Sequence, residues 1–306
     1  MRCGVDIGGT NTIIGIVDDK GKIIDSDCLK TGKYESAADL TVTIAYSILR
    51  MAKVNQASIE SIGVGCPNIN PGNGRIEKAA NLNFKEAVSL RDEFLKYFPD
   101  TPLFFENDAR AATIGESVYG SAKGLKNFIL VTLGTGLGCG IMHEGQLLEG
   151  ELGMAGEVGH AIIHPGGRRC GCGRQGCLEQ YVAANGILAT YRETCLRNGE
   201  QARAEDYHAL AELARQGDST ALQAYREAGT TLGIALANMA CFSSPSHIFL
   251  FGGVAQAGEP LMAPAREAFE KNLLFCYQGR IRLEFSGLMH SARNAGILGA
   301  AALYRR

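Results

Sequence analysis

The chain has 306 residues, of which 46% are hydrophobic and 20% charged, and its formal net charge is −2. This composition is typical of a globular protein with room for two domains, and it argues against a broad basic surface for nucleic acid. No apolar run approaches the ~18 residues of a membrane span, and no signal peptide is recognisable. With ten cysteines best explained as reduced thiols, a cytoplasmic location is expected.

The first third of the chain alternates strand-like and helix-like patterns. An apolar run ends at Gly8-Gly9, two strands follow around an Asp-Lys-Gly turn, and Ser36 is a candidate helix cap. The expected elements are strands at 3–9, within 12–29, at 59–67 and at 102–108, and helices at 36–54 and 108–120.

The rest of the chain repeats this alternation, so we expect an α/β protein with two helix-flanked sheets. The expected elements are two strands within 127–150, mostly helix over 178–241, strands at 247–252 and 280–288, and helices at 260–274 and 293–306. The domain boundary is expected near 118, which gives a small domain of 1–118, joined by the C-terminal helix 291–306, and a large domain of 119–290.

Two glycine turns stand between apolar strands, and they resemble each other. The first contains Gly8, Gly9, Thr10 and Thr12, and the second contains Gly134, Thr135 and Gly136. Glycine N–H groups can approach phosphate oxygens closely, and threonine hydroxyls add donors. Neither turn fits a P-loop or a dinucleotide fingerprint, so ligand-free hairpins remain the alternative. The similarity of the turns indicates internal duplication and one ligand held between two domains.

One carboxylate and one cysteine cluster are candidates for chemistry and for metal binding. Asp108 follows an apolar strand, where it could serve as a catalytic base or merely cap the next helix. Cys170, Cys172 and Cys177 could supply three zinc ligands, with His160 or His164 as the fourth. A closed site with four protein ligands would be structural rather than catalytic.

Seven motifs resemble the ROK family (repressors, open reading frames and sugar kinases) along nearly the whole chain. They are DIGGTNT (6–12), ENDA (106–109), LGTGLGCG (133–140), EVGH (157–160), CGCGRQGCLE (170–179), FLFGGV (249–254) and GILGAA (296–301). The cysteine motif with the upstream EVGH is highly specific. The resemblance implies a two-domain actin-like ATPase, ribonuclease H-like fold of the hexokinase class. It also implies an ATP-dependent sugar kinase, most similar to bacterial glucokinases.

The resemblance assigns roles to the motif residues. Asp108 becomes the catalytic base, and His160 rather than His164 becomes the fourth zinc ligand. The expected sugar contacts are Asn107, Asp108, Glu157, His160, Glu179 and Asn68. The expected nucleotide and magnesium contacts are Asp6, Gly8, Gly9, Thr10, Asn11, Thr12, Gly134, Thr135, Gly136, Gly252 and Gly253. The cofactors are therefore ATP, magnesium and a structural zinc.

Three departures from the family pattern affect this assignment. Asn11 replaces a common lysine and removes a positive charge near the phosphates, and Asn68 replaces a common glycine in a loop near the sugar. In the segment 79–84, Phe84 replaces tryptophan.

Glucose is the expected substrate, and three other functions remain as alternatives. An N-acetylglucosamine, N-acetylmannosamine or fructose kinase would use the same mechanism. A sugar-responsive transcriptional regulator would carry a winged-helix domain, whereas only five residues precede Asp6. A silent sugar-binding protein would lack a catalytic part, and no such part is missing. The family also implies a homo-oligomer, either a dimer or a tetramer.

Overall fold

The computed structural model describes residues 1–76, 82, 84, 86–291 and 295–306. The chain forms two compact units and contains two five-stranded sheets. Unit 1 comprises Met1–Leu125, Gln146–Ala155 and His290–Arg306, and unit 2 comprises Lys126–Gly145 and Gly156–Met289. The division into folding domains of 1–118 with 291–306, and of 119–290, stays a prediction.

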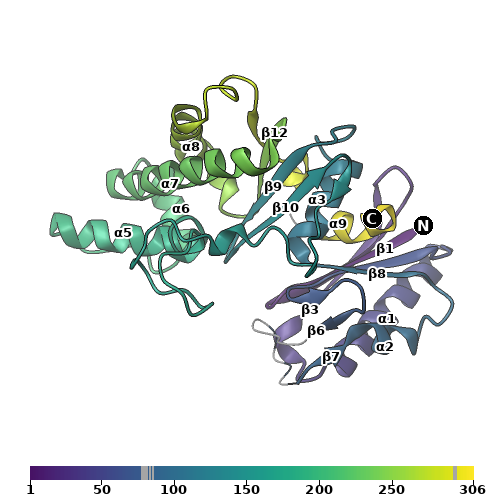
Figure 1. Ribbon diagram of the computed structural model, residues 1–306. Coiled ribbons are helices and arrows are strands. Elements are labelled where there is room, and N and C mark those ends of the chain that lie inside the picture. The colour runs from purple at the N-terminus through teal and green to yellow at the C-terminus, as the bar shows by residue number, and fades with distance from the viewer. Residues whose placement is uncertain (77–81, 83, 85, 292–294) are drawn as a thin grey trace. The chain divides into compact units, whose positions relative to one another are not determined.

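Unit 1 holds the first strands and the last helix of the chain (Figure 1). Its strands are β1 (Arg2–Ile7), β2 (Asn11–Val17), β3 (Ile23–Lys30), β4 (Ser61–Gly65), β5 (Ile69–Asn70), β6 (Arg75–Ile76), β7 (Val88–Ser89), β8 (Leu103–Glu106) and β11 (Gln146–Leu147). Its helices are η1 (Thr31–Lys33), α1 (Ala37–Val54), α2 (Leu90–Leu95), α3 (Asp108–Tyr119), α9 (Ala295–Ala301) and η5 (Ala302–Arg305).

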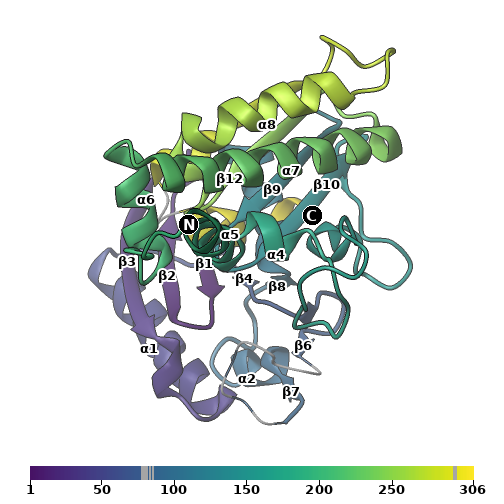
Figure 2. The same cartoon turned by 90° about the vertical axis from the view of Figure 1, so that its left-hand side faces the viewer.

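Unit 2 holds most of the long helices. Its strands are β9 (Phe128–Leu133), β10 (Leu137–His143), β12 (His247–Phe251) and β13 (Arg282–Phe285). Its helices are η2 (Val158–His160), α4 (Glu179–Val182), α5 (Ala184–Asn198), α6 (Tyr207–Arg215), α7 (Ser219–Ser243), η3 (Ala255–Ala257), α8 (Glu259–Asn272) and, at its end, η4 (Gly287–Ser291). Figure 2 shows α7 and α8 side by side, and both contribute to the core beneath them.

The two five-stranded sheets have the same strand order. The order is β3-β2-β1-β4-β8 in one and β11-β10-β9-β12-β13 in the other. In one sheet β1 pairs antiparallel with β2 and parallel with β4. In the other, β9 pairs in the same way with β10 and β12. Each glycine turn joins the two hairpin strands of its sheet. The repeated topology therefore agrees with the internal duplication that the two turns indicated.

A row of glycines lets helix α9 lie directly on the sheet of unit 1. Gly4 on β1 pairs in register with Gly15 on β2 and with Gly63 on β4. A Cβ at any of these positions would collide with α9. Side chains alternate between the faces of a strand, so Asp6 shares the α9 face with Gly4. The opposite face buries apolar side chains against α1.

The long elements follow the expected pattern. Helix α1 begins after Ser36, whose hydroxyl accepts a hydrogen bond from the Asp39 N–H group, and α3 ends at Gly120. The small sheet β5-β6-β7 was not expected, because two-residue strands carry no periodicity. The expected helix 293–306 is seen from Ala295 onward, and residues 292–294 lie outside the described residues.

Helices that could cross a membrane are not found among the described residues.

Candidate active site

The junction of β8 and α3 presents two polar side chains of the ENDA motif. Asn107 is the N-cap of α3, where its Oδ1 accepts hydrogen bonds from the N–H groups of Ala109 and Arg110. Asp108 is the first helical residue, and its Oδ1 accepts from the Ala109 N–H group at 2.9 Å. The capping role that sequence left open for Asp108 therefore belongs to Asn107. The Asp108 side chain keeps contact with solvent, which suits a residue that handles protons.

A second carboxylate lies close to Asp108. A Cβ placed on Gly65 would be 3.6 Å from Asp6 Oδ1 and 3.8 Å from Asp108 Cα, so a side chain there would enter the space beside both residues. A Cβ on Gly296 of α9 would collide with the Asp6 carboxylate. Glycine at these two positions therefore leaves room for Asp6 and for a ligand beside it. Two neighbouring carboxylates form a donor set that fits a hard cation such as magnesium.

The electrostatics of this pair favour a cation. Burial and the charge of Asp108 raise the pKa of Asp6 to about 7. Burial also raises the pKa of Asp108, although hydrogen bonds from the N–H groups of Asp108 and Ala109 and from the Asn107 side chain oppose the rise. Asp108 touches solvent, but the protein packed around it limits its hydration. A nearby cation would favour ionisation of both groups.

The first glycine turn, between β1 and β2, is held closed by the Gly8 N–H group, which donates to the Asn11 carbonyl at 2.9 Å. Gly9 and Thr10 are exposed at its tip. Thr12 is an exception among the expected phosphate contacts, because its side chain is fully buried and its hydroxyl pairs with the Thr31 hydroxyl at 2.9 Å. The buried Thr12 hydroxyl therefore stabilises the hairpin through its hydrogen bond with Thr31.

The second glycine turn forms one wall of a pocket of about 420 Å³ within unit 2. The lining residues are Gly134, Thr135, Ala184, Asn185, Asp206, Tyr207, His208, Ala211, Arg215, Gly253, Val254, Gln256 and Ala257. Gly252 has a φ of 107° and packs against the Leu133 carbonyl, which excludes a side chain there. The pocket is of a size that binds small molecules, and it joins the second turn to the Gly252-Gly253 segment.

Of the thirteen lining residues, sequence reasoning predicted only Gly134, Thr135 and Gly253. Asp206, Tyr207 and His208 enter it from the start of α6, and Arg215 enters from the end of the same helix. The segment 178–241 showed only a helical pattern, which does not reveal which helix ends face a ligand. An Asp N-cap followed by two ring side chains was the signal present in the sequence.

Glu179 connects the second glycine turn to the cysteine loop. It is the first residue of α4, and its Oε2 accepts a hydrogen bond from the Leu137 N–H group at 3.0 Å. A Cβ on Gly136 would lie only 2.7 Å from the same oxygen. The carboxylate expected to contact sugar thus lies directly against a turn expected to contact phosphate.

The cysteine loop gathers four metal-ligating side chains. The ligating atoms of His160, Cys170, Cys172 and Cys177 all lie within 4.8 Å of one another. The Sγ atoms of Cys172 and Cys177 are 3.7 Å apart, and His160 Nδ1 is 3.6 Å from Cys170 Sγ. Tetrahedral zinc with standard bond lengths separates two sulfurs by about 3.8 Å and a sulfur and a nitrogen by about 3.6 Å. The residues therefore fit a structural zinc ion.

The histidine that joins the cluster is the one that the resemblance selected. His164 instead packs its ring against Tyr181, with ring centres 4.5 Å apart. The other ring nitrogen of His160, Nε2, lies 4.0 Å from Glu157 Oε2. His160 can therefore present one nitrogen to a metal and the other, beside Glu157, to a hydroxyl.

The backbone explains one departure from the family pattern. Asn68 has a φ of 57°, in the left-handed region that glycine adopts freely and asparagine tolerates better than most residues. The exchange of glycine for asparagine therefore preserves the loop conformation and adds an amide. Of the segment 79–84, only Leu82 and Phe84 are described, both buried, and the rest lies outside the described residues.

A sequence model of the ROK family matches residues 2–306. The chain belongs to the ROK family.

The glucokinase of Thermotoga maritima is 33% identical to this chain over 312 residues, which cover 99% of this chain and 96% of that protein. A ROK family glucokinase from Streptomyces griseus, solved in complex with glucose and AMPPNP, has a TM-score of 0.82 at 30% identity and covers 99% of this chain and 98% of its own. The ROK hexokinase of Thermus thermophilus has a TM-score of 0.83 at 29% identity, with 98% and 96% coverage. These likenesses confirm the expected actin-like, ribonuclease H-like fold.

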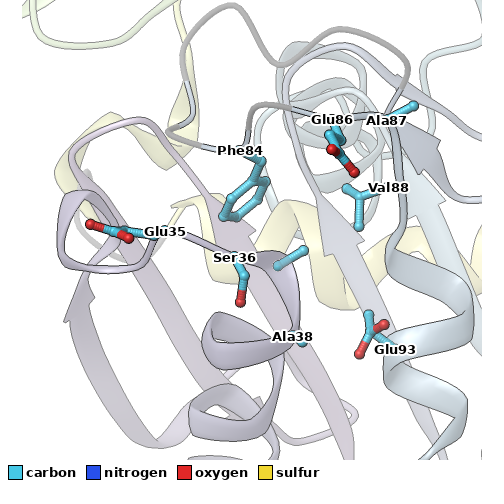
Figure 3. Close-up of a pocket in the computed structure, with 9 residues that line it drawn as sticks. Glu35, Ser36, Ala38, Phe84, Glu86, Ala87, Val88 and Glu93 are labelled. Carbon is cyan, nitrogen blue, oxygen red and sulfur yellow. The ribbon is translucent and has the colours of Figure 1, made fainter.

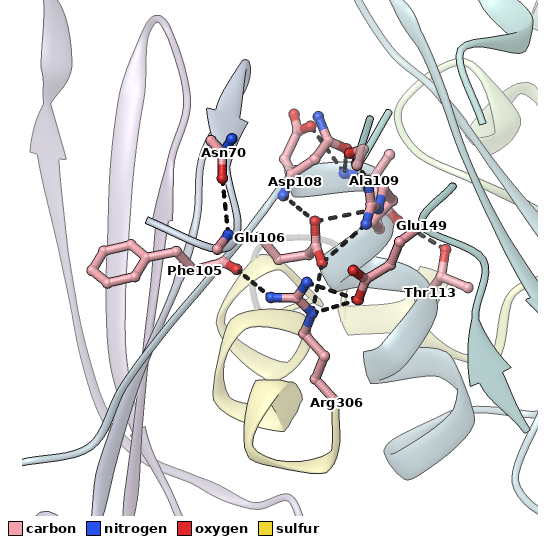
Figure 4. Close-up of polar contacts among 12 residues, drawn as sticks. Asn70, Phe105, Glu106, Asp108, Ala109, Thr113, Glu149 and Arg306 are labelled. Atoms are coloured by element: carbon pink, nitrogen blue, oxygen red, sulfur yellow. Dashed lines mark hydrogen bonds and ion pairs between the residues drawn. The ribbon is translucent and has the colours of Figure 1, made fainter. Parts of the chain in front are cut away.

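A network of ion pairs is centred on Glu106, the buried first residue of the ENDA motif (Figure 4). Glu106 is fully buried, and its Oε1 accepts a hydrogen bond from the Asn107 N–H group at 2.9 Å. Arg110 Nε lies 3.2 Å from Oε1, and Arg306 Nε lies 3.3 Å from Oε2. Arg306 also pairs with Glu149 at 2.7 Å. Sequence reasoning did not identify this network, because Glu149 and Arg306 lie far from Glu106 in the chain.

Besides the pocket of unit 2, unit 1 has a pocket of about 640 Å³, and none of the expected site residues lines it (Figure 3). It lies between the start of α1 and the segment that leads into α2. Its lining includes Phe84 and the glutamates Glu35, Glu86 and Glu93. Glu93 is paired with Lys96 at 2.6 Å, so part of its negative charge is already compensated.

The raised pKa of Asp6 predicts a pH-dependent loss of stability. An aspartate titrates near 3.8 when unfolded, whereas Asp6 titrates near 7 in the fold. The folded state thus binds more protons between these values, and its stability falls as pH rises through that window. Asp6→Asn should raise the melting temperature at pH 8 by about 4 °C in magnesium-free buffer and change little at pH 4.

Calorimetry at the two pH values measures this difference. Asp100→Asn changes an exposed aspartate of the same unit and should leave both melting temperatures unchanged. Equal melting temperatures of the Asp6 variant and the parent protein at pH 8 would show that ionisation of Asp6 does not destabilise the fold.

Proposed function

We propose that this ROK protein is an ATP-dependent glucokinase that forms glucose 6-phosphate and ADP. The observation that carries the proposal is the Asp108 carboxylate. It lies at the start of α3, in contact with solvent and beside Asp6. This arrangement supplies a base next to a site for phosphate and its cation, which is what phosphoryl transfer requires. The glucokinase relatives support the same substrates.

Asp108 accepts the proton of the attacking sugar hydroxyl. The hydroxyl oxygen bonds to the γ-phosphorus while the bond from that phosphorus to the ADP oxygen breaks. Its raised pKa makes it a stronger proton acceptor than an ordinary aspartate once it is ionised. We assign the sugar contacts to Asn107, Asn68, Glu157, His160 and Glu179. Carboxylates and amides hydrogen-bond neighbouring hydroxyls well, and they leave a costly unpaired group when a hydroxyl is missing.

We assign the adenosine side of ATP to the pocket of unit 2. The phosphates are assigned to the N–H groups and hydroxyls of the two glycine turns. Magnesium would be held near Asp6 and would screen the charge of the phosphates. Zinc bound by His160, Cys170, Cys172 and Cys177 would hold the EVGH motif close to Glu179 without taking part in the chemistry.

A panel of hexoses tests the substrate. Coupled ADP release should give a kcat/KM for glucose at least about tenfold above those for mannose, fructose, N-acetylglucosamine and N-acetylmannosamine. A larger kcat/KM on an N-acetylated sugar or on fructose would replace glucose by that substrate. Absence of ADP release with every sugar would contradict the kinase assignment.

Three expectations about the cellular context remain proposals. A cytoplasmic location would supply ATP and keep the ten cysteines reduced. A homodimer or a dimer of dimers is expected, and light scattering coupled to gel filtration measures it. No nucleic acid or membrane partner is expected, and a gel shift with duplex DNA tests the regulator alternative.

A further inference from the structure

A lysine of the neighbouring strand β3 lies beside the first glycine turn. Asn11 begins β2 and Lys30 ends β3, and the two residues are directly paired in the antiparallel register. Lys30 Nζ donates a hydrogen bond to Asn11 Oδ1 at 2.9 Å. The ammonium group therefore lies beside the side chain of Asn11, the residue that replaces a lysine common in the family pattern.

The backbone around this pair is firmly connected to the turn. The Thr31 N–H group donates to the Thr10 carbonyl at 3.0 Å, and the Thr31 hydroxyl pairs with the buried Thr12 hydroxyl at 2.9 Å. Lys30 is thus fixed by its neighbour to the same loop that presents Gly8 and Gly9. Only its side chain, which is exposed, retains freedom to reach a ligand.

The charge of Lys30 is not neutralised by its partner, because the Asn11 amide carries no charge. Asp6, at the end of β1, and Asp108 make the neighbourhood of the turn acidic. A polyphosphate approaching the turn would be repelled by these carboxylates unless cations offset them. Lysine is well suited to this task as a compact charge on a flexible stem.

We propose that Lys30 supplies the cationic contact to the terminal phosphates of the nucleoside triphosphate, in place of the lysine missing at position 11. The proposal rests on the proposed function, since it assumes that phosphates bind at this turn. Asn11 acts as a positioning residue, because its amide oxygen holds the ammonium group at the turn.

Four variants test the proposal. Lys30→Met removes the charge and keeps the aliphatic length, and Lys30→Arg keeps the charge. The double variant Asn11→Lys/Lys30→Met moves the charge to the neighbouring position. Lys22→Met is the matched control, because Lys22 is an exposed lysine just before the opposite end of β3.

Lys30→Met should raise the KM for ATP and the Kd for AMPPNP about tenfold, since a charge-assisted contact is worth about that factor. The Kd for AMP and the KM for glucose should change by less than about twofold, because the lost contact is to the terminal phosphates. Lys30→Arg and the double variant should recover most of the affinity for AMPPNP, and Lys22→Met should match the parent protein. Titration calorimetry and steady-state kinetics give these values.

Three results would overturn the proposal. They are an unchanged Kd for AMPPNP in Lys30→Met, an equal loss of affinity for AMP and AMPPNP, and no recovery in the double variant. The calorimetric titration also separates the two levels of inference. A parent protein without kinase activity would contradict the proposed function, while its AMPPNP titration would still report on Lys30.

Discussion

Asp108→Asn should lower kcat for glucose phosphorylation by about a thousandfold, because the amide cannot accept the proton of the attacking hydroxyl. Asparagine keeps the size of the side chain and can still accept the hydrogen bond from the Ala109 N–H group, so α3 should remain intact. The KM for glucose should change by less than about threefold, since the sugar contacts assigned to the other residues are retained. Coupled ADP release measures both constants.

The pH profile provides an independent readout of the same residue. Asp108 must be ionised to act as a base, so activity should rise as pH passes upward through its pKa. Because that pKa is raised, the acid limb of kcat/KM should lie above the usual aspartate range. Asp100→Asn should keep the full rate and the same profile. Retention of more than about a tenth of the parent kcat in Asp108→Asn would remove Asp108 from the role of base.

Cys177→Ser should abolish zinc binding and destabilise the protein. The Cys177 side chain is fully buried, and a serine hydroxyl is a poor replacement for a zinc-bound thiolate. We expect the zinc content to fall from about one ion per chain to near zero and the melting temperature to fall by about 10 °C, because a structural metal contributes several kcal/mol. Elemental analysis and calorimetry measure the two effects.

The same variant should affect glucose more than ATP. Zinc would fix His160 and hold the EVGH motif close to Glu179, so its loss should raise the KM for glucose by at least about tenfold. The KM for ATP should change much less. Cys241→Ser, an exposed thiol on α7 outside the cluster, is the control and should retain zinc, stability and activity. A fully metallated and equally stable Cys177→Ser protein would refute a zinc centre here.

Sequence predicted the long elements well because they depend on local signals. Ser36 caps α1 as its hydroxyl predicts, and α3 ends at Gly120 as expected, although Gly120 is in extended backbone. The metal cluster was also readable, because three of its ligands are neighbours in the chain. What sequence could not supply was contact between distant segments, such as the pairing of Glu106 with Arg306 or the bond from Glu179 to the second glycine turn.

Two site residues show the same limit at close range. Thr12 looked like a phosphate contact because it follows the glycines, yet β-pairing turns its hydroxyl inward to Thr31. Lys30 was not predicted as a site residue, because nineteen positions separate it from Asn11 and only the register of β2 and β3 brings the two together. Strand pairing decides both cases, and it is not visible in either segment alone.

Much of the joint between α9 and its neighbours is made of main chain. Gly4 and Gly63 meet main-chain atoms of α9, Gly15 meets the Ile297 side chain, and Gly115 of α3 meets Gly299 of α9 with no space for a methyl group. The main-chain contacts have no alternative rotamers through which they could adjust. Helix α3, α9 and the sheet of unit 1 should consequently behave as a single rigid block. The position of the Asp108 backbone, at the start of α3, should therefore be fixed by this block.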